Sequence, residues 1–312
     1  MAAGSLLFHL YTLFLFTKSD VKILIPPVTL FAAATAPPYK LSRLLHTILW
    51  LWVHTLQFGL ANQTLPRALS EDLMNHPDRP LLAGRITVRR ARTLRWMMMP
   101  LCLLLSAAYG PKTLLTGFGV SLFMLAYDEC GGARSHWLAR NALNAIGYAL
   151  AEVGATLITC QSENEIDTTV WIAVALSAGI ILTTIHTQDY KDVLGDTAVG
   201  RVTLPIAYPT LSRVVTAFFL IAWSWGISRT WHLDSVAAAV LGILALIVGI
   251  RFVARRDSCA DKVSFYWYNV SYHMRTRHSD LSYANFRCGL VLYMCSLVIT
   301  GCASTIMTEY FL

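Results

Sequence analysis

Hydrophobic residues along the chain fall into long runs separated by short polar connections. About nine of these runs are long enough, with some extension or tilt, to cross the roughly 30 Å hydrocarbon core of a bilayer as helices. They cover residues 21–34, 44–59, 96–109, 113–126, 142–160, 170–186, 214–227, 235–250 and 288–307. The pattern predicts an all-α fold, a polytopic bundle of about nine transmembrane helices. No linker-like tract divides it, so residues 1–312 are predicted to form a single transmembrane domain.

An additional apolar stretch, residues 6–16, precedes the first predicted span. No small-residue cleavage site follows it, so we do not interpret it as a signal peptide that is removed. We expect residues 1–17 to form an interfacial N-terminal segment. Pro26 and Pro27 lie inside the first predicted span and predict a kink there.

Composition agrees with a membrane protein, since 55% of the residues are hydrophobic, only 14% are charged and the mean hydropathy is +0.52. Most of the 25 Lys and Arg residues follow the second, fourth, sixth and eighth predicted spans. The positive-inside rule places those connections in the cytosol, and we expect an endoplasmic reticulum protein whose site faces that side. This asymmetry explains the net charge of +7 without a nucleic-acid partner. Seven cysteines without a C-x-x-C pair argue against a disulfide framework or a zinc site.

The sixth predicted span ends in "DYKDVLGDTAVGRVTLP", which places three acids close together. On a continuing helix Asp189, Asp192 and Asp196 would project from one face and repel one another. A cation must then lie against them, and Mg²⁺ takes hard oxygen ligands from carboxylates and phosphates. The alternative is a helix end in water whose acids are simply solvated.

The residues after the second predicted span follow an order similar to that of the residues after the sixth. Asn62 stands where the span leaves the hydrocarbon, and an acidic pair, two arginines and a Gly-Arg followed by Thr come after it. Carboxylates that hold a metal beside guanidiniums that bind phosphate oxygens form a diphosphate clamp. We therefore expect the two stretches to be halves of one site. The predicted metal ligands are Asn62, Glu71, Asp72, Asp189, Asp192 and Asp196. All of these except Glu71 are also predicted to be catalytic. The predicted diphosphate-binding residues are Arg79, Arg85, Arg134, Lys191 and Arg201.

At these residues the chain resembles the UbiA-type intramembrane prenyltransferase superfamily. "DYKDVLGDTAVGRVTLP" is similar to the second aspartate-rich motif of that family, and "NHPDRPLLAGRIT" is similar to the stretch after its first. The resemblance covers about residues 18–305. It implies a helical bundle around a central lipid-accessible cavity, Mg²⁺ as cofactor, and a prenyl diphosphate whose tail lies among the helices beside membrane lipid. The site loops would be residues 60–93, 127–141 and 187–213.

The first motif departs from the family pattern, which begins Asn-Asp and continues with further acids. Here the stretch reads "NQTLPRALSED", with Gln63 in place of the first acid. Asp72 is therefore a stronger metal candidate than Asn62. Together with "LFTKSDVKILIPP" and "DECGGARSHWLARNALNAIGY", this version resembles the fungal branch of the superfamily, which includes terpene cyclases.

Three further features leave alternatives open. The segment Asp128–Asn141 is either a lid that excludes water, with Arg140 among its charged residues, or an amphipathic loop. Glu152 in mid-span either accepts a proton from a carbocation or bonds a neighbouring helix. The basic stretch 255–286 is expected to lie on anionic headgroups. Aromatic candidates for a carbocation pocket, or for core and interfacial packing, are Trp50, Trp52, Phe118, Phe123, Tyr127, Trp137 and Tyr148.

The expected function is that of a Mg²⁺-dependent intramembrane terpene cyclase, which ionises farnesyl or geranylgeranyl diphosphate and cyclises the allylic cation. The first alternative is a prenyltransferase that moves the chain to an aromatic or lipid acceptor. The second is a non-catalytic lipid-binding or transport protein on the same bundle.

Overall fold

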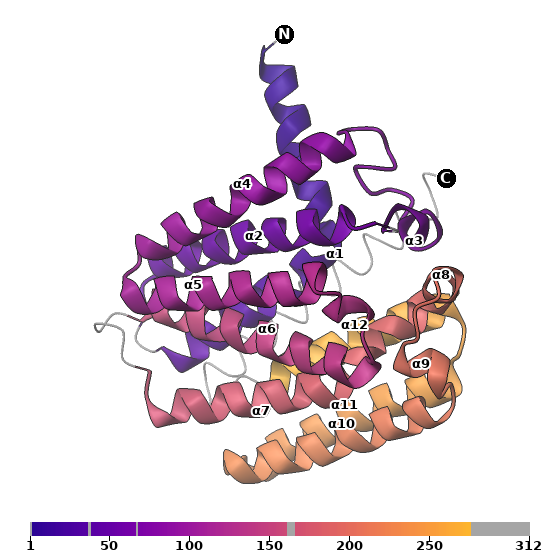
Figure 1. Ribbon diagram of the computed structural model, residues 1–312. Helices are drawn as coiled ribbons and strands as arrows, with labels where there is room; N and C mark the ends of the chain where they lie inside the picture. Colours follow the sequence, from indigo (N-terminus) through magenta and orange to yellow (C-terminus); the bar gives the residue numbers. More distant parts are fainter. Residues whose placement is uncertain (1, 37–38, 67, 161–165, 276–312) are drawn as a thin grey trace. The chain divides into compact units, whose positions relative to one another are not determined.

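The computed structural model describes residues 2–36, 39–66, 68–160 and 166–275, and over these residues the chain forms helices and turns without a strand (Figure 1). The long helices are α1 (Ala2–Thr35), α2 (Leu41–Gln63), α4 (Val88–Ala107), α5 (Pro111–Met124), α6 (Trp137–Thr159), α7 (Thr168–Thr184), α10 (Leu211–Thr230), α11 (Ser235–Ala254) and α12 (Ser258–Arg275). The shorter ones are α3 (Ala68–Asn75), α8 (Val193–Ala198), α9 (Leu204–Ala207), the π-helical turn η1 (Leu125–Glu129) and the 3₁₀ segments η2 (Gly132–Arg134) and η3 (Ile185–Asp192).

The all-helical prediction is confirmed for the described chain. Each predicted span before residue 251 corresponds to one long helix, and the predicted span 288–307 lies outside the described residues. Within the described ranges, 5 helical stretches are both long and apolar enough to cross a membrane. They are Leu41–Gln63, Trp137–Thr159, Thr168–Ala198, Leu211–Thr230 and Ser235–Ala254. The number of crossings therefore stays a prediction.

The N-terminal part of the chain is one helix of 34 residues, α1, rather than a short segment followed by a separate span. Pro26 and Pro27 lie inside it. The apolar run 6–16 and the predicted first span are thus continuous, because the polar residues between them do not end the helix. Whether residues 1–17 lie in the membrane interface stays a prediction.

Several helices begin at side-chain caps that the sequence supplies. Asp167 accepts a hydrogen bond from the backbone N–H of Val170 at 2.8 Å at the start of α7, and Asp234 caps α11 in the same way. Thr87 caps α4. A capping oxygen satisfies a backbone N–H that would otherwise lack a partner, which fixes where each helix starts.

The helices that surround the candidate site pack closely through small residues. Trp50 of α2 is fully buried, and its Nε1 donates a hydrogen bond to Ser106 Oγ of α4 at 2.9 Å. A Cβ at Gly154 of α6 would lie 2.5 Å from the Trp50 ring. Only glycine therefore lets α6 approach α2 at this depth.

Glu152, the acid in the middle of α6, belongs to a contact between helices. Ser177 Oγ of α7 donates to Glu152 Oε1 at 2.5 Å. Glu152 does not line the cavity described below. Of its two interpretations, the structure therefore favours the bond to a neighbouring helix.

Candidate functional site

A cavity of about 360 Å³ lies within the unit Met1–Arg277, lined by residues of α1, α2, α3, α5, α6, η3, α8 and α12. One end is highly charged. Its acidic lining residues are Asp20, Glu71, Asp72, Asp78, Asp189, Asp192 and Asp196, and its basic lining residues are Lys18, Lys22, Arg79, Arg140, Lys191, Arg201 and Lys262. The other end is mainly apolar and aromatic, with Trp50, Leu51, Phe58, Val120, Phe123 and Tyr127 among its residues. The cavity is therefore suited to a ligand with an anionic head and an apolar tail.

The second acidic stretch, Asp189 to Asp196, does not continue the preceding α-helix, contrary to the expectation from the sequence. α7 ends at Thr184, and the chain continues as the 3₁₀ segment η3 before α8 begins, so the three acids do not share one continuous α-helix. A 3₁₀-helix has three residues per turn, which aligns Asp189 with Asp192 along one edge. Asp196 follows from α8, and all three line the cavity.

Each of these three acids has a cationic partner. Asp189 pairs with Arg140 of α6, Asp192 pairs with Lys191, and Asp196 Oδ1 accepts from Arg201 Nη1 at 3.1 Å. Asp189 and Arg140 are both buried, so this pair also fixes η3 against α6. From the sequence, Arg140 belongs to either a lid or an amphipathic loop, and the structure pairs it with an acid of the second motif.

The first acidic stretch lines the same cavity. Asn62 comes from the end of α2, Glu71 and Asp72 come from α3, and Arg79 follows α3. Asp72 is only 3% exposed and pairs with Arg79. Burial raises the pKa of Asp72, Arg79 opposes this, and the charges of Glu71 and Asp192 raise it further. The charge of Asp192 in the second acidic stretch thus acts on Asp72 in the first.

Arg201 joins the two halves directly. Its Nη1 donates to Glu71 Oε1 at 2.9 Å as well as to Asp196, and its Nη2 donates to the carbonyl of Ala133 at 3.3 Å. The preceding Gly200 has a φ of 71°, a left-handed conformation that favours glycine and turns the chain back toward α8. The two stretches are therefore in direct contact and line one cavity, and that they act together as one site stays a prediction.

A neutral contact also holds the halves together. α3 and α8 lie close to each other at one end of the bundle (Figure 1), and the Asn75 carboxamide packs directly on the backbone of Gly195. A Cβ at residue 195 would overlap that carboxamide.

The structure does not bring two of the predicted diphosphate-binding residues to the cavity. Arg85 packs on α1, where its Nε donates to Thr12 Oγ1 at 3.0 Å and its guanidinium lies 4.2 Å from the centroid of the Phe8 ring. Arg134 donates to the carbonyl of Pro66 at 3.4 Å in an exposed position. Neither lines the cavity, because the turns that carry them direct them toward α1 and toward the end of α2.

Gln63, which replaces the usual first acid, also faces away from the cavity. It is buried, and its Nε2 donates to the carbonyl of Phe16 in α1 at 2.9 Å. An uncharged amide can make this contact, whereas a carboxylate would oppose a carbonyl oxygen. At this position the chain uses the side chain for helix packing.

The expected lid, Asp128–Asn141, contributes little to the cavity. Tyr127 just before it and Arg140 within it line the cavity, whereas Asp128, Glu129, Arg134 and His136 do not. Glu129 pairs with Arg95 of α4 instead.

Sequence reasoning missed most of the contribution of α1 and α12. Lys18, Asp20 and Lys22 of α1 line the charged end, and Lys262 and Tyr266 of α12 face them. The signals were the charges of "FTKSDVK", and the helical spacing of polar and aromatic residues in "DKVSFYW". The prediction that residues 255–286 lie on anionic headgroups does not include this contribution to the cavity.

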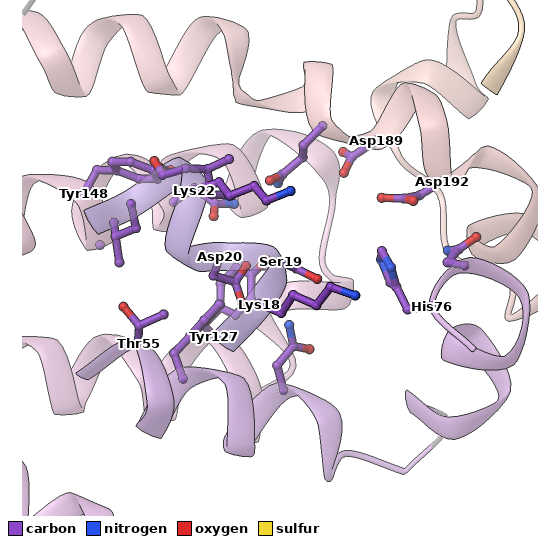
Figure 2. A pocket seen from close by; sticks show the side chains of 18 of the residues that line it. Lys18, Ser19, Asp20, Lys22, Thr55, His76, Tyr127, Tyr148, Asp189 and Asp192 are labelled. Carbon is purple, nitrogen blue, oxygen red and sulfur yellow. Dashed lines mark hydrogen bonds between the residues drawn. The ribbon is translucent and has the colours of Figure 1, made fainter. Parts of the chain in front are cut away.

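Aromatic side chains form much of the apolar end. Of the aromatic candidates, Trp50, Phe123, Tyr127 and Tyr148 line the cavity, and Trp52, Phe118 and Trp137 do not. Figure 2 shows Tyr127 and Tyr148 on the side of the cavity away from Asp189, Asp192 and His76. Burial lowers the pKa of His76 to about 4, so its imidazole is neutral at pH 7.

The donor set fits Mg²⁺ that arrives with a phosphate. No group of three or more Asp, Glu, His or Cys poised to hold a metal occurs in the described part of the chain. Mg²⁺, however, usually binds through one or two carboxylates plus substrate phosphates. Asp196 is 1% exposed, and its Oδ2 has no hydrogen-bond partner among the residues that the structure describes. That oxygen is available to a cation.

Comparisons with known proteins identify the family. Residues 23–270 match the UbiA prenyltransferase family. The chain belongs to this family. Family membership and the apolar helices make it an integral, multi-pass membrane protein. It is an enzyme, because members of the superfamily are prenyltransferases or terpene cyclases.

Three curated relatives of this UbiA family member differ in their named activities. Fumagillin beta-trans-bergamotene synthase of Aspergillus fumigatus is 30% identical over 260 residues, which is 83% of this chain and 88% of the relative. A diterpene cyclase of Hericium erinaceus is 28% identical, over 81% of this chain and 82% of the relative. A polyprenyl transferase of Hericium erinaceus is 27% identical, over 82% and 88%. The chain therefore has relatives of both reaction types.

Solved structures share the fold. A UbiA homologue from Archaeoglobus fulgidus bound to GPP and Mg²⁺ superposes with a TM-score of 0.58 at 15% sequence identity, over 85% of this chain and 99% of the homologue. At this identity the likeness concerns the helical arrangement alone.

Proposed function

We propose that this protein is a Mg²⁺-dependent intramembrane terpene cyclase, which ionises farnesyl or geranylgeranyl diphosphate, cyclises the allylic cation and releases diphosphate. The observation that carries the proposal is the cavity with a charged mouth and an aromatic interior. It matches a prenyl diphosphate in chemistry and in polarity. We also propose that the mouth faces the cytosol from the endoplasmic reticulum membrane, on the asymmetry of basic residues in the sequence.

The charge balance at the mouth favours a metal-dependent reaction. The acidic and basic side chains that line the cavity are equal in number, and most basic ones already pair with a carboxylate. The mouth therefore has no surplus of positive charge for a diphosphate. Mg²⁺ bound at Asp72, Glu71, Asn62, Asp189, Asp192 and Asp196 would supply that charge and stabilise the leaving diphosphate.

Basic side chains of the mouth would hold the diphosphate. Arg79, Lys191 and Arg201 each bind an acid of the motifs, so they lie beside the proposed metal positions. Lys22 and Lys262 have no carboxylate partner in the described chain, and Lys22 Nζ lies 5.5 Å from the centroid of the Tyr266 ring. We propose that these two lysines bind phosphate oxygens directly.

The interior would protect the carbocation. Phe58, Phe123 and Tyr127 are in mutual ring contact, with centroids 5.6–6.3 Å apart, and all three line the cavity. Aromatic faces attract a cation, and a wall of rings excludes water that would capture it. The chain's own alkene is then the nearest nucleophile, which supports cyclisation.

Prenyl transfer to an aromatic or lipid acceptor is the second candidate, favoured by the polyprenyl transferase relative. A non-catalytic lipid-binding or transport role is set aside, because the family consists of enzymes.

The purified protein in liposomes, incubated with Mg²⁺ and farnesyl or geranylgeranyl diphosphate, tests this proposal. We expect diphosphate release and a cyclic product in the organic extract without an acceptor, and loss of both with a chelator. Product that forms only after addition of an aromatic or lipid acceptor would identify a transferase. Release that persists in the presence of the chelator would overturn the metal assignment.

A further inference from the structure

One acidic side chain in the cavity differs from all the others. Every other acid that lines it forms an ion pair, which joins Glu71, Asp72, Asp78, Asp189, Asp192 or Asp196 to a lysine or an arginine. Asp20 of α1 also lines the cavity, but within the described residues it has neither an ion pair nor a side-chain hydrogen bond. A carboxylate that is largely removed from water is costly unless a positive charge or a hydrogen bond balances it. Asp20 is therefore the acid of this lining whose charge no described side chain balances by direct contact.

The position of Asp20 indicates which cation would balance this charge. Figure 2 shows it between the motif acids Asp189 and Asp192 on one side and Thr55 and Tyr148 on the other. Its carboxylate interacts electrostatically with Arg79 and Lys191 at the mouth and with Tyr148 toward the interior. Asp20 thus lies at the boundary between the part suited to the diphosphate and the part suited to the prenyl tail, where an allylic cation would form.

We propose that Asp20 is a catalytic residue, the base that accepts the proton with which cyclisation ends. This inference rests on the proposed cyclase function. In the final step a C–H bond next to the cationic carbon breaks. Its electron pair forms a new C=C bond, and the proton moves to a carboxylate oxygen of Asp20. The product is a neutral alkene, and the carboxylic acid later returns its proton to water at the mouth. No oxidant, reductant or further reactant is needed.

Asp20→Asn tests the assignment, because the amide keeps the size of the side chain and removes the base. The motif acids remain, so diphosphate release should fall by less than about threefold, while the yield of the native alkene should fall at least about tenfold, since a positioned base accelerates proton transfer by roughly 10²–10⁴-fold. Alcohols from water capture, or alkenes with a displaced double bond, should replace it. Asp20→Glu restores a base and should recover alkene as the main product class.

Asp257→Asn is the matched control. Asp257 is an exposed acid outside the cavity lining, where it caps α12 through Ala260, and asparagine caps a helix equally well. This variant should keep the native product ratio. Products are identified by gas chromatography and mass spectrometry, and diphosphate release is measured in the same samples.

The outcomes separate this inference from the function on which it depends. A wild-type protein that releases no diphosphate without an acceptor fails the cyclase proposal itself. An active wild type whose Asp20→Asn variant yields unchanged products overturns only the role of Asp20. Loss of diphosphate release together with a higher Mg²⁺ requirement would also overturn it, because Asp20 would then be a metal ligand. A wild-type alcohol product would do the same.

Discussion

The two acidic stretches follow the same sequence plan, yet they are built differently. After α7 the acids, Lys191 and Arg201 all reach the cavity from one continuous segment, which consists of η3, α8 and the turn after α8. After α2 the equivalent groups are spread over α3 and the turn beyond it, and Gln63 and Arg85 pack on α1 instead. The difference shows that a motif can keep its pattern while two of its members pack on a neighbouring helix instead of lining the cavity.

The Gly-Arg pairs illustrate this most clearly. Gly84 and Gly200 both have left-handed φ angles, 64° and 71°, so the two backbones turn alike. Arg201 then bridges Glu71 and Asp196, whereas Arg85 lies over the rings of Phe8 and Tyr11. Local backbone geometry is thus repeated, but the neighbours that the turn meets decide what the arginine does.

The largest effect is expected in the compact half. Asp192→Asn removes a proposed metal ligand and should lower the rate of diphosphate release on the order of 10³-fold, since charge stabilisation of the leaving group is the main source of catalysis. Asp192 is partly exposed, so the fold should persist. Thermal unfolding in detergent checks this, and wild-type turnover in a folded variant would remove Asp192 from the metal site. Asp189 is less suitable for this test, because its loss would leave Arg140 buried without a partner.

An intermediate effect is expected where the halves meet. Arg201→Lys keeps the charge but loses the planar guanidinium that serves Glu71 and Asp196 together. We expect diphosphate release to fall roughly 10²-fold, with a higher Mg²⁺ requirement, because the acids of the two halves are no longer held in register. A Mg²⁺ titration of initial rates measures both. If Arg201→Lys matched the wild type, the bridge would have no part in the site.

The smallest effect is expected at the matching arginine of the other half. Arg85→Ala should change diphosphate release by less than about threefold, because Arg85 does not line the cavity. Its contacts with the Phe8 and Tyr11 rings should cost about 1 kcal/mol of stability when lost. Comparison of rates and unfolding midpoints for this variant and Arg201→Lys gives the contrast. A large rate loss here would mean that Arg85 reaches the substrate after all.

Hydrophobic runs and acid spacing predicted much of the molecule. The runs located the long helices up to α11, because helices that cross a bilayer are predominantly apolar, but they did not predict α12. The acids at Asp72 and Asp189 were expected in one site, and both line one cavity. Their pairing with Arg79 and Arg140 joins residues from different helices. Spacing along the chain does not determine such pairs.

The departures have a common cause in tertiary contacts. The 3₁₀ path of η3 shows no distinct signal in "IHTQDYKD". Arg85 was predicted to bind the diphosphate, but α1 passes close enough to bind it, as it also binds Gln63. The role of α12 was hidden because its charged and aromatic residues also resemble a surface helix.

The Asn75–Gly195 contact should be insensitive to the ionic strength of the solution. Ion pairs such as those of Arg201 weaken as dissolved salt screens them, but an amide resting on a bare backbone does not depend on ionic strength. Gly195 therefore leaves the space that the Asn75 carboxamide fills, and a single added methyl group at residue 195 would displace that carboxamide without altering any charge.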